Sequence, residues 1–202
     1  MAILLHTDHS EIGGAEVSTK AVYQVHPLRD PRWAELVGNH TGSSVFHTVQ
    51  WLEALQRTYG YEPTAYTTSP PGTTLENGVV FCRVTSWLTG RRLVSLPFSD
   101  HCEPLMATAE DEQLFASTIE QALHREKLRY AEIRATGGDL FATSRVSRST
   151  RAYCFHRLDL RPDLTTLFRN CHKSSTQRKI LRAEREGLTC EIGRSESLLN
   201  AF

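Results

Sequence analysis

Basic side chains are concentrated in one short segment, His172 to Gly187, and their spacing suits the binding of an anion. Arg178, Arg182 and Arg185 fall at positions i, i+4 and i+7, which places them on one face of a helix. A guanidinium group can donate two parallel hydrogen bonds to a phosphate or a carboxylate. The segment therefore predicts an anion-binding helix, with an ordinary solvated amphipathic helix as the alternative.

Signals for both ends of this helix are present in the sequence. Ser174 and Gln177 fit a capping box, in which each side chain satisfies a free backbone N–H at the start of the helix. Gly187 stands where a residue with left-handed backbone geometry can end a helix. We therefore expect one helix over residues 174–186.

A second group of reactive side chains, Asp100, His101, Cys102 and Glu103, directly follows a predicted strand. A cysteine beside a histidine can be a nucleophile or a metal ligand. Adjacent residues on an extended chain point in opposite directions, however, so His101 is poorly placed to activate Cys102. Lining of a substrate pocket by Asp100 and His101, a structural loop, and catalysis or metal binding remain open as interpretations of this segment.

His47 and Trp51 lie four residues apart, so they can share one helix face at a pocket. We keep His47 as a candidate substrate-binding residue, with a role at the start of a helix as the alternative. The large aromatic residues are interpreted as packing residues: Trp33, Phe46, Trp51, Trp87 and Phe98. The sequence has no G-x-S-x-G, H-E-x-x-H or G-x-x-x-x-G-K-[ST] motif, and the catalytic residues stay unknown.

The composition is that of a globular protein, with 40% hydrophobic and 23% charged residues among 202. The net charge is zero, which gives no global electrostatic argument for binding nucleic acid or membranes. The charge is unevenly distributed, however. Residues 1–144 hold 11 Lys and Arg against 17 Asp and Glu, while residues 145–194 hold 12 against 5. This asymmetry indicates two units with different roles.

The five cysteines are widely spaced and form no C-x-x-C pair, which favours reduced thiols over a disulfide framework or a zinc site. The first residues, MAILLHTDHSEIGG, contain only a short apolar run, followed by acidic residues. They predict neither a secretory signal nor a transmembrane segment. We therefore expect a cytoplasmic protein without a metal site.

Hydrophobic periodicity and turn signals predict a mixed α+β chain. We expect a loose leader over residues 1–16, a first domain over 17–145, and a linker with an incomplete second domain over 146–202. The expected strands are residues 17–26, 62–68, 77–87, 91–98, 128–135, 152–160 and 188–192. The expected helices lie around Trp33, over 48–60, over 109–127 with Thr108 and Asp111 at its start, over 163–170, over 174–186, and from Ser195 onward. Residues 143–151 are expected to be the linker.

Three segments of the chain resemble the FemAB-like family of GNAT-fold acyl and aminoacyl transferases. They are VFHTVQWLEALQRTYGYEP (45–63), VVFCRVTSWLTGRRLVSLPFSDHCEPL (79–105) and KSSTQRKILRAEREGL (173–188). The three occur in the order in which the family has them, and the resemblance covers roughly residues 30–202. It implies GNAT-like α/β domains, each with a twisted mixed sheet flanked by helices. It also implies that this chain holds the complete first domain and only the start of the second.

The resemblance further implies transfer of an acyl or aminoacyl group to an amine of a cell-wall (peptidoglycan) or exopolysaccharide-related acceptor. The acyl donor would be acyl-CoA or aminoacyl-tRNA, used as a co-substrate. By position, Arg178 matches an arginine that contacts the anionic precursor in the peptidoglycan-bridge enzymes, with Lys173, Lys179 and Arg182 as neighbours. The acidic-His-Cys segment at 100–103 departs from the Gly-rich residues that family members often have there.

Three functional hypotheses follow. The first is a truncated acyltransferase. The second is a non-catalytic module that binds an anionic ligand. The third, an RNA-binding protein, lacks interleaved aromatic residues in its basic helix, and no DNA partner is expected. The nearest match to a CoA pyrophosphate loop, residues 134–139, ends in Asp139, where a carboxylate would repel phosphate.

Overall fold

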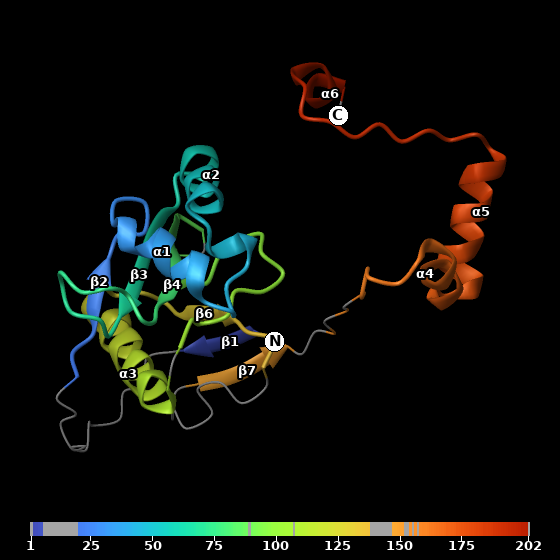
Figure 1. Cartoon of the computed structure of the whole chain (residues 1–202). Coiled ribbons are helices and arrows are strands. Elements are labelled where there is room, and N and C mark those ends of the chain that lie inside the picture. The colour runs from blue at the N-terminus through green and yellow to red at the C-terminus, as the bar shows by residue number, and fades with distance from the viewer. Residues whose placement is uncertain are drawn as a thin grey trace. The chain divides into compact units, whose positions relative to one another are not determined.

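The computed structural model describes residues 2–5, 20–88, 90–106, 108–137, 147–151, 154, 156 and 158–201 (Figure 1). The chain divides into two compact units, Met1–Phe155 and His156–Phe202. This division falls ten residues after the boundary expected between residues 145 and 146.

The first unit is built from seven strands and three α-helices in its described part. The strands are β1 (Ala2–Leu5), β2 (Tyr23–Val25), β3 (Glu62–Thr67), β4 (Val79–Ser86), β5 (Gly90–Val94), β6 (Ala131–Arg134) and β7 (Ser147–Arg151). The helices are α1 (Pro31–Asn39), the 3-10 turn η1 (Val45–His47), α2 (Val49–Tyr59) and α3 (Ala109–Arg125).

The strands form one mixed sheet in the order β2-β3-β4-β5-β6-β1-β7. Every neighbouring pair is antiparallel except β5 and β6, which are parallel and are connected through α3. The parallel pairing is short, with Leu93 opposite Ala131 and Val94 opposite Glu132. The prediction of a mixed sheet flanked by helices is therefore confirmed as far as the strand directions and the presence of the helices are concerned.

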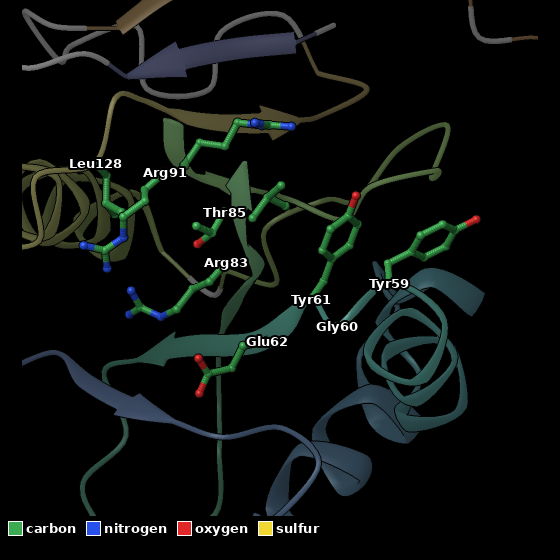
Figure 2. Close-up of a pocket in the computed structure, with 10 residues that line it drawn as sticks. Tyr59, Gly60, Tyr61, Glu62, Arg83, Thr85, Arg91 and Leu128 are labelled. Atoms are coloured by element: carbon green, nitrogen blue, oxygen red, sulfur yellow. The ribbon is translucent and has the colours of Figure 1, made fainter. Parts of the chain in front are cut away.

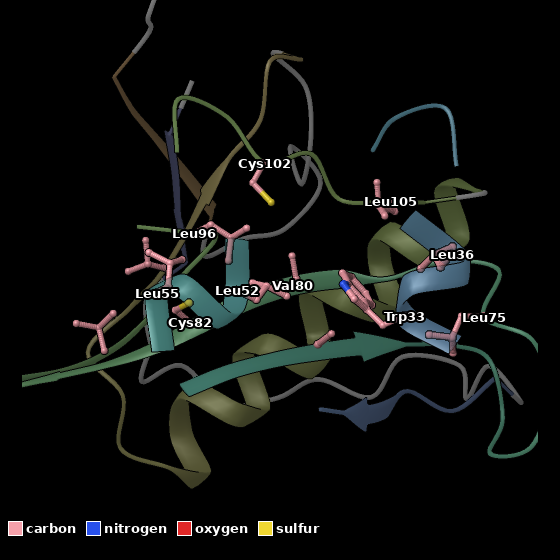
Figure 3. Packing of buried hydrophobic residues seen from close by; sticks show 13 residues of the cluster. Trp33, Leu36, Leu52, Leu55, Leu75, Val80, Cys82, Leu96, Cys102 and Leu105 are labelled. Carbon is pink, nitrogen blue, oxygen red and sulfur yellow. The ribbon is translucent and has the colours of Figure 1, made fainter. Parts of the chain in front are cut away.

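Helices cover both faces of the sheet and enclose a separate apolar cluster on each (Figure 1). On one face, α3 contributes Phe115, Ile119 and Leu123, which pack with alternate side chains of β4, β5 and β6. On the other face, Trp33 of α1 and Leu52 of α2 pack with the strand residues that point away from α3, such as Val80 and Cys82 of β4 (Figure 3). Alternation of side chains along each strand therefore supplies both clusters.

Local sequence signals account for the helix ends in this unit. Thr48 caps α2, and Gly60 ends it with a left-handed φ of 67°. Thr108 and Asp111 form the predicted capping box at the start of α3. The helix expected around Trp33 is also confirmed, because Asp30 caps α1 and Pro31 occupies its first turn.

The chain leaves β5 earlier than the sequence predicted. The expected strand reached residue 98, but the observed strand ends at Val94, and the Leu96 N–H donates back to the Val94 carbonyl at 2.8 Å. Leu96 and Phe98 both have positive φ angles, 59° and 63°, which no β-strand allows. Phe98 is 59% exposed and Trp87, at the β4–β5 turn, is 96% exposed. The interpretation of Trp87 as a packing residue was therefore wrong, whereas the Phe98 ring lies against the Tyr59 ring, with 4.7 Å between the centroids.

Two segments outside the predicted strands also join the sheet. Residues 2–5, expected in a loose leader, form β1 between β6 and β7. Residues 147–151, expected in a linker, form β7 at the sheet edge. The predicted strand at 17–26 is shorter, since β2 spans Tyr23–Val25 and residues 17–19 lie outside the described part.

The second unit contains only helices and irregular segments in its described part. The helices are α4 (Leu164–Asn170), the π-helical turn η2 (Lys173–Gln177), α5 (Arg178–Arg185) and α6 (Glu196–Ala201). Residues 158–160 and 188–192 form no strand, so this part of the prediction was wrong. The remainder of the expected strand at 152–160 includes residues outside the described part. No described residue from 158 to 201 is buried.

Candidate functional site

The basic segment folds as a continuous helical run, with η2 leading directly into α5. The predicted capping box is wrong. The Gln177 side-chain amide donates to the Cys171 carbonyl at 2.7 Å and to the Arg169 carbonyl at 3.2 Å, away from the helix start. The hydroxyl of Ser174 lies 3.3 Å from His172 Nδ1 instead. The wide π turn brings both the Thr176 and the Gln177 N–H groups onto the His172 carbonyl.

The C-terminal end of this helix follows the prediction. Gly187 has a φ of 66°, and its N–H donates to the Glu184 carbonyl at 3.1 Å. The Leu188 N–H donates to the Ala183 carbonyl at 3.0 Å. These two bonds form a Schellman motif, which satisfies the last carbonyl groups and fixes where the basic face ends.

The cations of η2 and α5 are exposed, and one of them is paired. Arg182 Nε lies 2.7 Å from a carboxylate oxygen of Glu186, one turn further along the helix. Among the described residues, Lys173, Arg178 and Lys179 form no ion pair within 4.0 Å. This part of the helix can therefore offer guanidinium and ammonium donors to an anionic ligand without first breaking a salt bridge.

The loop after β5 carries the second predicted group, and its members have different surroundings. Asp100 is exposed, and His101 is half-buried with its ring edge-on to Phe46 at 5.4 Å between centroids. The carboxylate of Glu103 accepts hydrogen bonds from the backbone N–H and the hydroxyl of Thr136. Cys102 is buried. Glu103 thus ties the loop to the segment after β6, and Asp100 is the only one of these four residues that is exposed.

The sequence reasoning missed the partner of Cys102, which is His47. Cys102 Sγ lies 3.4 Å from His47 Nε2, and both residues are buried. The Ser44 N–H donates to Nδ1 at 3.0 Å, so Nδ1 is the acceptor nitrogen and Nε2 carries the proton. Nε2 lies 2.8 Å from the Glu103 carbonyl oxygen, to which it therefore donates. The ring is a neutral connector between η1 and the loop after β5.

This thiol–imidazole pair is unsuited to nucleophilic catalysis. Burial lowers the pKa of the His47 imidazole, against the opposing effect of its hydrogen bonds with Glu103 and Ser44. Burial also raises the pKa of the Cys102 thiol. A catalytic cysteine needs the reverse, a thiolate beside a base that can accept its proton. The His47 carbonyl is also engaged, by the Trp33 indole N–H at 2.9 Å.

A cavity of about 200 Å³ lies beside the start of β3, where the β4–β5 hairpin extends beyond it (Figure 2). None of the predicted site residues lines it. Its deepest cation, Arg83, donates from both terminal nitrogens to the carboxylate of Glu126, so it has no free charge for a ligand. Burial raises the pKa of Glu126, but the hydrogen bond and charge of Arg83 outweigh this and hold it below its usual value.

The structure therefore brings His47, His101 and Cys102 together in the first unit, and Lys173, Arg178, Lys179 and Arg182 together in the second. Within the described residues, no group of three or more His, Cys, Asp or Glu side chains is arranged to hold a metal ion. In the same part of the chain, no helix combines the length and the apolar composition needed to cross a membrane. Residues 138 and 139, in the segment compared with a CoA loop, lie outside the described residues.

Comparison with known proteins gives no match: none among family models, none among curated proteins and none among solved structures.

Proposed function

We propose that this chain is an acyl or aminoacyl transferase of the FemAB/GNAT type, acting in the cytoplasm on an amine of a cell-wall or exopolysaccharide-related acceptor. The observation that carries the proposal is the parallel β5–β6 pair, connected through α3 inside an otherwise antiparallel sheet. A mixed sheet flanked by helices is what the resemblance to GNAT-fold transferases implies.

The two parallel strands separate directly after their short pairing. The Ser95 N–H still donates to the Glu132 carbonyl at 2.7 Å. The backbone groups of Arg134, at the end of β6, no longer bond to the backbone of β5. Its N–H donates to the Ser95 hydroxyl at 2.8 Å, and its carbonyl accepts from the Cys102 N–H at 2.6 Å. Backbone donors at such a separation can stabilise the charge that develops on an acyl oxygen. Here an acyl donor would have to displace the Ser95 hydroxyl.

Acyl transfer to an amine requires little from the side chains of the protein. The amine attacks the carbonyl carbon, the C–N bond forms as the bond to the leaving group breaks, and a proton leaves the nitrogen. Positioning of both substrates supplies most of the rate, so no cysteine nucleophile is needed. The closed Cys102–His47 pair is compatible with direct transfer from acyl-CoA or aminoacyl-tRNA to the acceptor.

The basic helix gives the acceptor a defined contact in this proposal. Arg178 is exposed and unpaired among the described residues, and Lys173 and Lys179 lie within one turn or two of it. An anionic precursor, carrying phosphate or carboxylate groups, would meet these side chains. A charged hydrogen-bonded contact contributes about 1.5–3 kcal/mol, which is roughly 10- to 100-fold in affinity.

The proposal is tested by incubating the whole chain with a panel of acyl-CoA or aminoacyl-tRNA donors and phosphate-bearing amine acceptors. Mass spectrometry of the acceptor detects the added acyl group. We expect product with the native chain, and a rise in KM of roughly 10- to 100-fold for Arg178→Ala. The control is Arg57→Ala, which removes an exposed arginine of α2 that is paired with Glu53. Equal KM values for the two variants would contradict the assigned contact, and absence of product with every pair would contradict the transferase.

A non-catalytic module that binds an anionic ligand is the alternative, and one observation favours it. The one thiol–imidazole pair found among the described residues is buried and inert, while the cations of α5 are exposed. This alternative predicts binding of the same acceptors, weakened by Arg178→Ala, without any transfer. Isothermal titration calorimetry measures this binding, and mass spectrometry shows whether any acceptor is modified. Binding without modification supports the non-catalytic module. A chain that neither binds nor modifies the acceptors has neither function.

A further inference from the structure

The hairpin of β4 and β5 extends further than the neighbouring strand β3. The first residue of β3 is Glu62, which lies opposite Arg83, whereas β4 continues to Ser86. The segment before Glu62 leaves the line of the strand at Gly60, whose φ of 67° is left-handed, and joins α2. The last residues of β4 therefore have β5 on one side and, among the described residues, no strand on the other.

The alternation of hydrogen bonds shows which backbone groups of β4 are open there. Pro63, which lies opposite Cys82, has no N–H, so the bonds between β3 and β4 at this point run through the next pair, Glu62 and Arg83. Backbone groups along a strand alternate between its two sides. The groups of Thr85, two residues after Arg83, therefore point to the same side, where β3 is no longer present.

The β5 side of the hairpin leads independently to the same result. Thr85 lies opposite Arg91, and the Arg91 carbonyl accepts from the Arg129 N–H at 2.8 Å, on the β6 side of β5. Two opposite residues of an antiparallel pair either exchange both hydrogen bonds or point their backbone groups apart, so Thr85 points away from β5. Thr85 is exposed, and no backbone bond joins it to the described residues outside the strands. Its N–H and C=O form an open donor–acceptor pair, which we name the open edge.

The cavity of about 200 Å³ lies at this open edge. Its lining includes Val84 and Thr85 of β4 and the turn that leads into β3, with Gly60 and Tyr61 (Figure 2). Tyr61 and Val84 belong to the face of the sheet that α1 and α2 cover. Glu62 and Thr85 follow them on the chain and point to the opposite face. An occupant of the cavity therefore meets an apolar wall on one face and a polar wall on the other.

We propose that the open edge binds a short extended peptide, which continues the line of β3 for about three residues. The main chain of a peptide offers both a donor and an acceptor to Thr85, and its side chains alternate between the two faces. A lone anion would use the N–H and leave the carbonyl without a partner. Trp87, 96% exposed and two positions beyond Thr85, adds an apolar contact for the same peptide. This site uses neither α5 nor the end of β6, so it stands independently of the transferase proposal.

Hydrogen exchange of the Thr85 amide in the isotopically labelled whole chain tests the site by NMR. The probe is the peptide acetyl-Thr-Val-Thr-amide, which places an apolar side chain between two polar ones. The Thr85 amide should exchange rapidly in the free chain, and an excess of the peptide should slow this exchange at least about tenfold. The matched probe carries N-methyl groups on its backbone amides. It keeps the side chains but cannot donate to the Thr85 carbonyl, so we expect no protection.

Two variants of Thr85 separate its backbone from its side chain. Thr85→Pro removes the open N–H, and because this N–H faces away from β5 the hairpin keeps its own hydrogen bonds. The affinity for the peptide, measured from the chemical shifts of neighbouring amides, should fall at least about fivefold. Thr85→Val retains the N–H and a β-branched side chain, and it should bind as the native chain does. Circular dichroism of both variants confirms folding.

Four results would overturn the proposal. A Thr85 amide that is protected in the dilute free chain would show that the edge is closed, and an excess of peptide without effect would show that it binds no peptide. Equal protection by the N-methylated peptide would show that main-chain bonds do not hold the ligand. Protection that rises with the concentration of the chain itself, together with a dimer in sedimentation, would assign the edge to a second copy.

Discussion

The two units of this chain differ in how their helices are stabilised. In the first unit, apolar side chains such as Trp33 and Phe115 are completely buried on the two faces of the sheet. In the second unit, no described residue is buried, and Leu164 and Ile192 face solvent. The difference teaches that these helices rest on hydrogen bonds between residues close in the sequence, whereas the sheet depends on contacts between distant segments.

The energies expected for the two units follow from this difference. Burial of a large apolar side chain contributes about 1.5–3 kcal/mol to the first unit. The helix α5 has instead a Schellman end at Gly187 and the Arg182–Glu186 pair, and an exposed i,i+4 pair contributes only about 0.3–0.5 kcal/mol. Isolated helices of this length are marginal in water.

The largest expected effect comes from Leu93→Ala, compared with Leu181→Ala. Leu93 is completely buried in the cluster under α3, so its truncation should reduce the free energy of unfolding by about 2–5 kcal/mol. Leu181 of α5 is 54% exposed, so Leu181→Ala should change the free energy of unfolding by at most about 0.5 kcal/mol. Urea unfolding followed by tryptophan fluorescence and by circular dichroism measures both. Similar losses in the two variants would contradict the contrast between the units.

A smaller effect is expected where a methyl group is added to a glycine. At Gly78 an added Cβ would meet Trp33 Cζ3 at 2.7 Å, and at Gly193 it would meet Leu198 Cδ1 at 2.6 Å. The Trp33 ring is fixed by buried neighbours, so Gly78→Ala should cost about 1–3 kcal/mol. The end of the Leu198 side chain can rotate away, so Gly193→Ala should cost at most about 0.5 kcal/mol.

The same urea unfolding experiment distinguishes the two glycines. The crystal or solution structure of Gly78→Ala should show Trp33 displaced, while Gly193→Ala should show only a new Leu198 rotamer. A stable Gly78→Ala variant with Trp33 in place would show that the contact between α1 and this residue is looser than the distances indicate.

Much of the local structure could be predicted from the sequence, because its causes lie within a few residues. The helix α3 starts at the predicted capping box, and α2 and α5 end at the predicted glycines. The strands β3 and β4 also lie within the predicted ranges, 62–68 and 77–87. The capping box at Ser174 failed because a competing local bond exists, from Gln177 to the carbonyls behind it.

The parts that could not be predicted depend on residues far apart in the chain. Cys102 was considered only with its neighbour His101, whereas its partner His47 is 55 positions away. The sequence signal for a structural role of His47 was its spacing from Ser44. Three residues apart, the two side chains come together across a single turn. The exposure of Trp87 was equally hidden, because a hydrophobic residue beside a strand is usually part of the core.

The smallest predicted effect is a pH dependence that belongs to the first unit through His47. Burial lowers the pKa of His47 in the folded chain, while the unfolded chain has the ordinary value of about 6.5. The unfolded state therefore binds a proton below about pH 6.5 that the folded state does not bind. Stability should be unaffected by this group above that pH and should fall as the pH is lowered, by up to about 1.4 kcal/mol per pH unit.

Urea unfolding at pH 7.5, 6.5 and 5.5, followed by tryptophan fluorescence, measures this slope, because Trp33, Trp51 and Trp87 all belong to the first unit. His47→Gln should be less stable than the native chain at pH 7.5, since its ring bonds to Ser44 and Glu103 are lost. It should also lose stability less steeply between pH 6.5 and 5.5, because glutamine does not titrate. Parallel slopes for the two proteins would place the acid sensitivity on another group and would leave the buried imidazole with a purely structural role.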